Sequence, residues 1–140
     1  MTVRKLLIFV LFIGPLLDAA PRITSSAASG PDLTVSLEST RPGWPRNEAK
    51  ITVTVRNVGH MLAPRSDCRV IIRQGHAPRQ VIRTIKKAVR ALGAGDRYEF
   101  AFPVKVGLGL FEVAATVDRK NKIAEADETN NAARIMIVGE

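Results

Sequence analysis

The sequence predicts an all-β domain, a sandwich of about seven antiparallel strands. Apolar and polar residues alternate in several separate segments, as in strands whose successive side chains point to opposite faces. These segments are rich in β-branched and aromatic residues, which favour strands. Turn-forming Gly, Pro, Asn and Asp residues separate them at the spacing of a sandwich.

The first predicted strand begins after Pro31, where Leu33, Val35 and Leu37 share one face. Prolines and a glycine in 40–47 then predict a loop, because proline cannot donate to a strand ladder. Residues 51–56 form the most regular strand, and the turn formers Asn57 and Gly59 end it. Further strands are predicted at 68–73, 98–102, 111–117 and 132–138.

The segment 81–92 fits two structures. Its apolar residues recur at helical spacing with basic residues opposite, which describes an amphipathic helix for a membrane or a partner. It also fits two short strands, 81–85 and 88–90, because several of its apolar residues are β-branched. We expect the two strands, since the neighbouring segments are predicted to be strands as well.

Residues 1–30 are predicted to be a secretory signal peptide and a short linker. Arg4 and Lys5 precede an apolar run, 6–17, and small residues follow up to Gly30, which are the three parts of an export signal. The run is shorter than the roughly 20 residues of a membrane span. We expect a secreted or periplasmic protein, with an uncleaved membrane anchor as the alternative.

The remaining residues, 31–140, suffice for one domain with a single core. Cys68 is the only cysteine, so an internal disulfide is excluded. It lies on the strand face opposite Arg69 and Arg73, and we expect it to be a small buried hydrophobe. A reactive or dimer-forming thiol is the alternative.

The charge balance is basic and uneven. The chain has 21 Lys and Arg against 13 Asp and Glu, and removing 1–30 leaves 18 against 12. A basic protein outside the cytoplasm is expected to meet an anionic surface such as lipopolysaccharide, acidic glycan or anionic lipid. A solvated face that only keeps the protein soluble is the alternative. The residues expected to make such a contact are Arg69, Arg73, Arg83, Lys86, Lys87 and Arg90.

Nucleic acid is not an expected partner, because the chain carries an export signal and lacks the interleaved aromatic residues of single-strand binders. The oligomeric state is not determined by the sequence.

The polar segment 118–131 has two interpretations. It supplies oxygens suited to calcium, at Asp118, Asn121, Glu125, Asp127, Glu128 and Asn130. However, Lys120 and Lys122 oppose a cation, and the spacing is not that of an EF-hand. We therefore expect a structural loop in which Asp118, Asn121, Asn130 and Asn131 bond the loop backbone and Ile123 turns inward.

No pattern indicates catalysis, a cofactor or a metal centre. His60, Cys68 and His76 show no spacing that would bring them together, as a zinc site requires. Trp44 lies in the proline-rich loop, where we expect it to cover one end of the core rather than stack on a ligand. The protein is therefore expected not to be an enzyme.

The motifs of the mature chain resemble the CARDB domain, a cell-adhesion-related domain of bacteria. The most specific motif is 117–131, which joins the last two predicted strands. The resemblance runs from Pro31 to Val138, and its other motifs are 32–35, 53–59, 91–95 and 109–113. It implies an immunoglobulin-like sandwich that acts as a binding or adhesion module. The heavy basic loading between Arg65 and Arg90 departs from the family pattern.

Three functions are therefore compatible with the sequence. The first is an envelope module that binds protein or glycan, and the second is a basic surface protein that binds anionic lipid, lipopolysaccharide or acidic glycan by charge. The third is an accessory domain that works beside a partner subunit. Charge-driven binding should weaken steeply with salt, because the Debye length is about 8 Å at physiological ionic strength.

Overall fold

The structure, a computed structural model, describes residues 29–41, 47–76 and 78–139. The predicted signal peptide, its cleavage site and Trp44 lie outside these residues. In the described part of the chain, no helix has the length and apolar character needed to cross a membrane.

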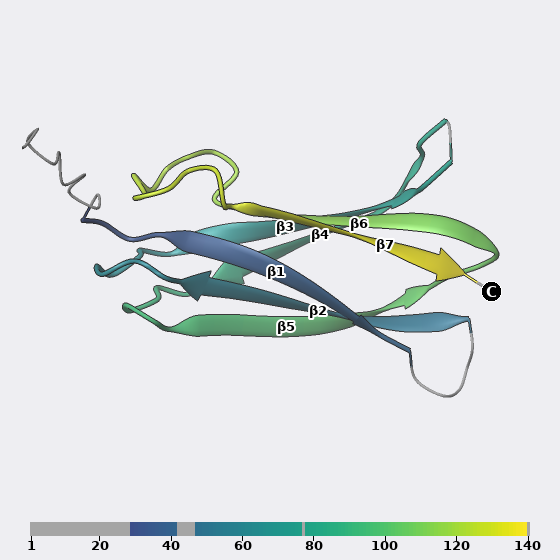
Figure 1. The fold of residues 1–140 in the computed structure, drawn as a ribbon, viewed down its shortest axis with the longest axis horizontal. Helices are drawn as coiled ribbons and strands as arrows, with labels where there is room; N and C mark the ends of the chain where they lie inside the picture. The colour runs from purple at the N-terminus through teal and green to yellow at the C-terminus, as the bar shows by residue number, and fades with distance from the viewer. Residues whose placement is uncertain (1–28, 42–46, 77, 140) are drawn as a thin grey trace, which may run out of the picture.

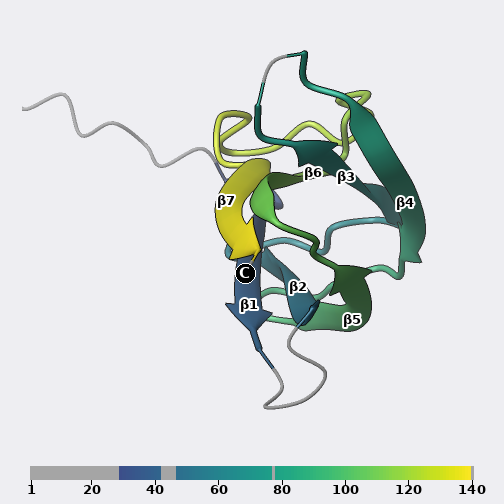
Figure 2. The same ribbon diagram turned by 90° about the vertical axis from the view of Figure 1, so that its right-hand side faces the viewer.

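Seven antiparallel strands form two sheets that pack face to face (Figures 1 and 2). The three-stranded sheet has the order β1-β2-β5, and the four-stranded sheet has the order β4-β3-β6-β7. The predicted all-β sandwich is thus confirmed. The strands are β1 (Leu33–Thr40), β2 (Glu48–Asn57), β3 (Ser66–Gln74), β4 (Val81–Val89), β5 (Arg97–Lys105), β6 (Gly109–Val117) and β7 (Ala132–Gly139).

The core consists of the inward-facing residues of both sheets. Ile51, Val53 and Val55 alternate along β2, and all three are fully buried. Val113, Ala115 and Val117 of β6 oppose them from the other sheet, and Phe111 is also buried. The predicted inward faces therefore form the core, because one face of each strand is removed from water.

The prediction for 81–92 was wrong in its details. One continuous strand, β4, pairs with β3 along its length, interrupted by a register shift between Ile72 and Arg73. The β4 strand lies at the edge of its sheet, so its apolar residues need not be buried. Val81 and Ile82 are more than half exposed, whereas Val89 is buried. Their helical spacing therefore reflects an edge position rather than a helix.

Cys68 is fully buried on β3, as expected from its position. Burial, with a smaller contribution from Asp67, raises the pKa of the thiol to about 12. We predict that the native protein does not react with Ellman's reagent at pH 8, because the thiolate is the nucleophile. The same protein unfolded in urea should release one equivalent of chromophore. Rapid stoichiometric labelling of the native protein would contradict the buried position.

Asn57 joins three loops at the end of the sandwich where β2 ends. Its Oδ1 atom accepts hydrogen bonds from the backbone N–H groups of Asp32 (3.1 Å) and Gly59 (3.0 Å). Its Nδ2 atom donates to the carbonyl oxygens of Met61 (2.7 Å) and Leu92 (2.9 Å), and also to that of Gly93. At the turn predicted at 57–59, Asn57 is therefore a fully buried junction residue, whereas Val58 beside it is exposed.

Gly59 is required at this junction for a steric reason. A Cβ atom at this position would lie 2.3 Å from the carbonyl oxygen of Gly30, well inside any real contact distance. Only glycine lets the β2 end approach the N-terminal segment this closely. The junction thereby fixes the entry of β1, which in turn contacts the 118–131 loop.

Candidate functional site

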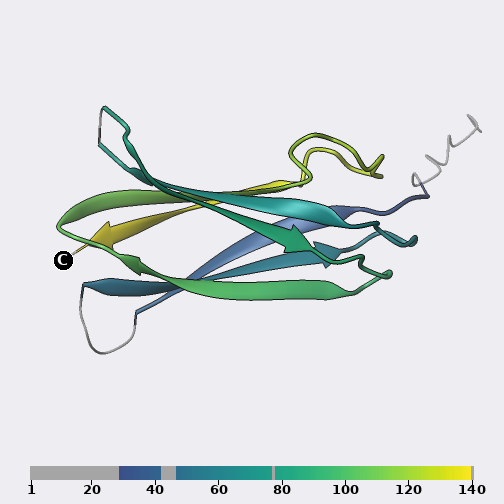
Figure 3. The same ribbon diagram turned by 180° about the vertical axis from the view of Figure 1, so that it is seen from behind.

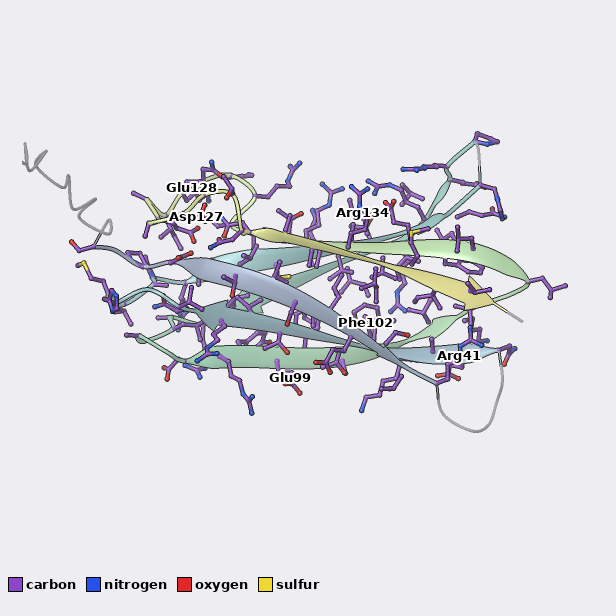
Figure 4. All side chains as sticks on the ribbon, viewed as in Figure 1. Arg41, Glu99, Phe102, Asp127, Glu128 and Arg134 are labelled. Atoms are coloured by element: carbon purple, nitrogen blue, oxygen red, sulfur yellow. The ribbon has the colours of Figure 1, made fainter. Side chains whose placement is uncertain are left out.

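The outer face of the four-stranded sheet carries a cluster of charged side chains. The register pairs Arg69 with Lys86 on one side and Arg73 with Glu112 on the other, so these residues share one face of the sheet. Arg134 pairs with Ala114, two residues beyond Glu112, and therefore lies on the same face. Figure 4 shows Arg134 pointing away from the three-stranded sheet. We call this surface the basic face.

Glu112 is the centre of the basic face. It is only 3% exposed, although it points away from the core. Arg73 donates to its Oε1 atom at 3.0 Å, and Arg79 lies 3.5 Å from its Oε2 atom. Arg134 is 3.7 Å from the same oxygen. Three guanidinium groups thus surround one carboxylate, which leaves the group with an excess of positive charge.

Two projecting loops border the basic face. The β3–β4 connection rises at one end of the sheet, and the 118–131 loop rises at the other end (Figures 1 and 3). Both project to the side away from the three-stranded sheet. Arg79 belongs to the first loop, and Arg119, Lys120 and Lys122 belong to the second. Basic residues therefore lie along the face and in the loops at both of its ends.

The six residues predicted to contact an anionic surface do not lie together. Arg69, Arg73 and Lys86 lie on the basic face. Lys87 and Arg83 pair with the buried residues Cys68 and Ile72, so the register places them on the opposite face of β4.

The contacts of Arg83 and Arg90 confirm that these two residues lie apart from the basic face. Arg83 donates to the carbonyl of Pro103 at 3.3 Å and lies over the ring of Phe102, 6.0 Å from its centroid. Arg90 lies beyond the end of β4, where it donates to the carbonyls of Ala91 and Arg97.

Sequence reasoning missed several residues of the site. Glu112, Arg79 and Arg134 are far apart in the chain, and their meeting depends on the pairing of β6 with β3 and β7. Strand alternation did place Glu112 opposite Phe111 and Val113, and hence on an outward face. The sequence did not reveal the registers of β6 with β3 and β7, which bring the arginines to Glu112.

The 118–131 loop is held by its own side chains. Asp118 and Asn121 have positive φ angles of 42° and 45°, which Asp and Asn tolerate better than most residues. The Asp118 Oδ2 atom accepts the backbone N–H of Ile123 at 2.8 Å, and Ile123 is buried as predicted. Asp127 accepts from the backbone and hydroxyl of Thr129, and these bonds lower the pKa of its carboxyl group.

The same loop fastens the start of β1. The backbone N–H of Ala126 donates to the carbonyl of Pro31 at 2.9 Å, and Glu125 accepts from the backbone N–H of Leu33. Asn130 donates to Asp32 at 2.7 Å. We predicted that Asn130 and Asn131 would bond backbone, and this detail was wrong. They bond carboxylates instead, since Asn131 donates to Glu125 at 3.2 Å.

The carboxylates considered for calcium are engaged in hydrogen bonds to the loop and to β1, whereas the Asn130 Oδ1 atom is buried and has no partner. Asp118 bonds Ile123, Glu125 bonds Leu33 and Asn131, and Glu128 accepts the backbone N–H of Glu125. Within the described ranges, no group of three or more His, Cys, Asp and Glu residues is arranged to hold a metal ion.

Burial raises the pKa of Glu125, and the hydrogen bonds from Leu33 and Asn131 oppose this shift only in part. A carboxyl group whose folded-state pKa is raised stabilises the fold at low pH, and this contribution is lost as the pH rises through the folded-state pKa. We predict that Glu125→Gln becomes more stable relative to the wild type as the pH rises from 4 to 7. Paired urea titrations across this range would measure the difference. A difference that is constant with pH would contradict the assignment.

Two antiparallel sheets packed in this order define an immunoglobulin-like β-sandwich domain. A family model for CARDB matches residues 30–134, so the chain belongs to the CARDB family. This confirms the family predicted from the motifs. A comparison with curated proteins finds no match.

Three solved domain structures have the same fold. The solution structure of a CARDB domain from Pyrococcus furiosus is 26% identical, with a TM-score of 0.61 over 79% of this chain and 95% of that one. A crystal structure of this Pyrococcus domain in complex with di-metal ions has 24% identity and a TM-score of 0.59, covering 79% and 94%. A domain of a suspected cell surface protein from Methanosarcina acetivorans has 19% identity and a TM-score of 0.55, covering 79% and 92%.

Proposed function

We propose that this protein is a non-catalytic binding module of the cell envelope and that its basic face binds an anionic partner, either an envelope protein or a glycan. The observation that carries the proposal is the group of three arginines around Glu112. A single carboxylate cannot neutralise three guanidinium groups, so the face keeps a local positive potential that attracts anions. Export by residues 1–30 would bring this face to envelope components.

The family supports a binding role rather than a specific ligand. The Methanosarcina domain, which has the same fold, comes from a suspected cell surface protein. Metal binding, as in the Pyrococcus crystal structure, is not extended to this chain, because the acidic loop uses its carboxylates for its own backbone and side chains. The arginines are suited to carboxylate, sulfate or phosphate groups, since guanidinium can donate two parallel hydrogen bonds.

The experiment is capture of envelope components by the immobilised mature protein at low and at high salt. The test variant is Arg79→Gln with Arg134→Gln, which retains Arg73 to neutralise Glu112. The matched control is Arg56→Gln with Arg97→Gln, an equal charge change on exposed residues of the three-stranded sheet. Capture should weaken with salt and in the test variant but not in the control. Equal capture by both variants would refute the basic face as the binding surface.

Direct binding to an anionic lipid surface or lipopolysaccharide is the second candidate. It is favoured by Met136 and Val138, which are about half exposed and lie on the same face as the arginines. Apolar side chains beside cations can enter the headgroup region while the cations bind lipid phosphates. Co-sedimentation with phosphatidylglycerol vesicles, and not with phosphatidylcholine vesicles, is the expected result for this candidate.

A further inference from the structure

A cavity of about 390 Å³ lies at the end of the basic face beside the 118–131 loop. Its walls come from the start of β3, the end of β4 and the loop that follows β6. The loop is fixed against β3 by the backbone N–H of Asp118, which donates to the carbonyl of Asp67 at 3.0 Å. The lining residues are Asp67, Arg69, Lys86, Lys87, Ala88, Arg119, Lys120 and Lys122, of which Lys87 belongs to the other face of the edge strand β4. We call this cavity the basic groove.

The groove concentrates cations without a matching set of anions. Six of its lining residues are Lys or Arg, and Asp67 is its one carboxylate. Among the described residues, none of these six forms an ion pair with a carboxylate. Like charges that line one cavity repel one another, and only charges farther apart than the Debye length of about 8 Å are largely screened by physiological salt. An anion in the groove would relieve that repulsion.

Arg69 provides a second, independent observation. It pairs with Lys86 in the register, so two cations lie directly opposite each other on neighbouring strands, an arrangement that destabilises a sheet. Its Nε atom is buried and has no hydrogen-bond partner. An unsatisfied buried donor costs stability. Both features of Arg69 lower the stability of the folded protein, and the packing of the sandwich does not require either of them.

We propose that the basic groove binds the phosphate monoester group of an envelope component. The proposal rests on the proposed function, because it names the chemical group that this end of the basic face would bind. A phosphate monoester carries close to two negative charges at pH 7, more than a carboxylate carries. Its three terminal oxygens can accept donors from three walls, and lysine ammonium groups are suitable point charges for phosphate. The group can belong to a phosphorylated sugar or to a lipid headgroup.

The first test is isothermal titration of the mature protein with glucose 6-phosphate and, as a neutral control, with glucose. The groove variant is Lys86→Gln with Lys120→Gln, and the control is Arg56→Gln with Arg97→Gln, an equal charge change on exposed residues of the three-stranded sheet. We expect binding of the phosphate ester alone, at least tenfold weaker in the groove variant and unchanged in the control. Equal loss in both variants, or equal displacement of the bound ester by chloride at matched ionic strength, would overturn the proposal, as would absence of binding both to glucose 6-phosphate and to vesicles with phosphatidic acid.

A second arm distinguishes the two sources of the phosphate group. Vesicles with phosphatidic acid, which carries a monoester headgroup, are compared with vesicles containing phosphatidylglycerol, which carries a diester. Preference for phosphatidic acid that is lost in the groove variant assigns the lipid source, and binding of the sugar phosphate alone assigns the glycan source. Capture of envelope components that survives when both arms fail would refute the groove and leave the proposed function intact. Phosphate binding by the groove without capture of envelope components would refute the proposed function and leave the groove as a phosphate site.

Discussion

Replacing Asn57 by Ala is expected to lower the free energy of unfolding by about 3 kcal/mol or more. The side chain makes hydrogen bonds to five backbone groups, and it is fully buried. Truncation leaves two N–H donors and three carbonyl acceptors without their partner, in a place that water reaches poorly. The loss is large against the about 5–15 kcal/mol that stabilises a typical domain. Urea denaturation followed by circular dichroism is the measurement.

Two further variants identify the cause. Asn57→Asp keeps the acceptor for Asp32 and Gly59 but presents a carboxylate to the carbonyls of Met61 and Leu92, so it should be at least as damaging. Its stability should recover in part at low pH, where a protonated carboxyl group can donate. The control is Asn130→Ala, which removes one hydrogen bond and should cost about 1 kcal/mol. Equal costs for Asn57→Ala and Asn130→Ala would contradict the role of Asn57 as a junction.

The strands could be predicted because burial acts on each strand separately. Ile51, Val53 and Val55 alternate with polar residues, and this local pattern alone determines which face of β2 enters the core. The β4 strand was mispredicted because it lacks this pattern of burial. An edge strand buries few side chains, so the positions of Val81, Ile82 and Ile85 carry no clear period of two. Its length is set by hydrogen bonds to β3, which local sequence does not reveal.

The candidate site was predictable only in part. Arg69, Arg73 and Lys86 were identified by charge, and alternation along β3 placed Arg69 and Arg73 on one face. The surroundings of Glu112 require three non-local facts, namely the β3–β6 register, the β6–β7 register and the course of the β3–β4 loop. A shift of one residue in either register would move Glu112 or its partners to the core face. No single segment contains that information.

Replacing Glu112 by Gln is expected to destabilise the protein by about 2 kcal/mol at low ionic strength. The carboxylate is the shared counterion of Arg73, Arg79 and Arg134, and without its charge the three guanidinium groups repel one another. The cost is moderated because Arg79 and Arg134 are mostly exposed and can turn into solvent. For a domain of this size the midpoint of thermal unfolding should fall by roughly 10 °C.

The same variant should respond to anions more than the wild type does. Millimolar sulfate can take the place of the lost carboxylate among the arginines, and an anion that binds only the folded state stabilises it. The control is Glu99→Gln, which removes an exposed carboxylate from the three-stranded sheet (Figure 4). Thermal unfolding with and without sulfate should show a larger rise for Glu112→Gln than for the control or the wild type. An equal rise of the unfolding midpoint in all three proteins would mean that the three arginines do not bind a common anion. That result would contradict the proposal that the basic face is a binding surface.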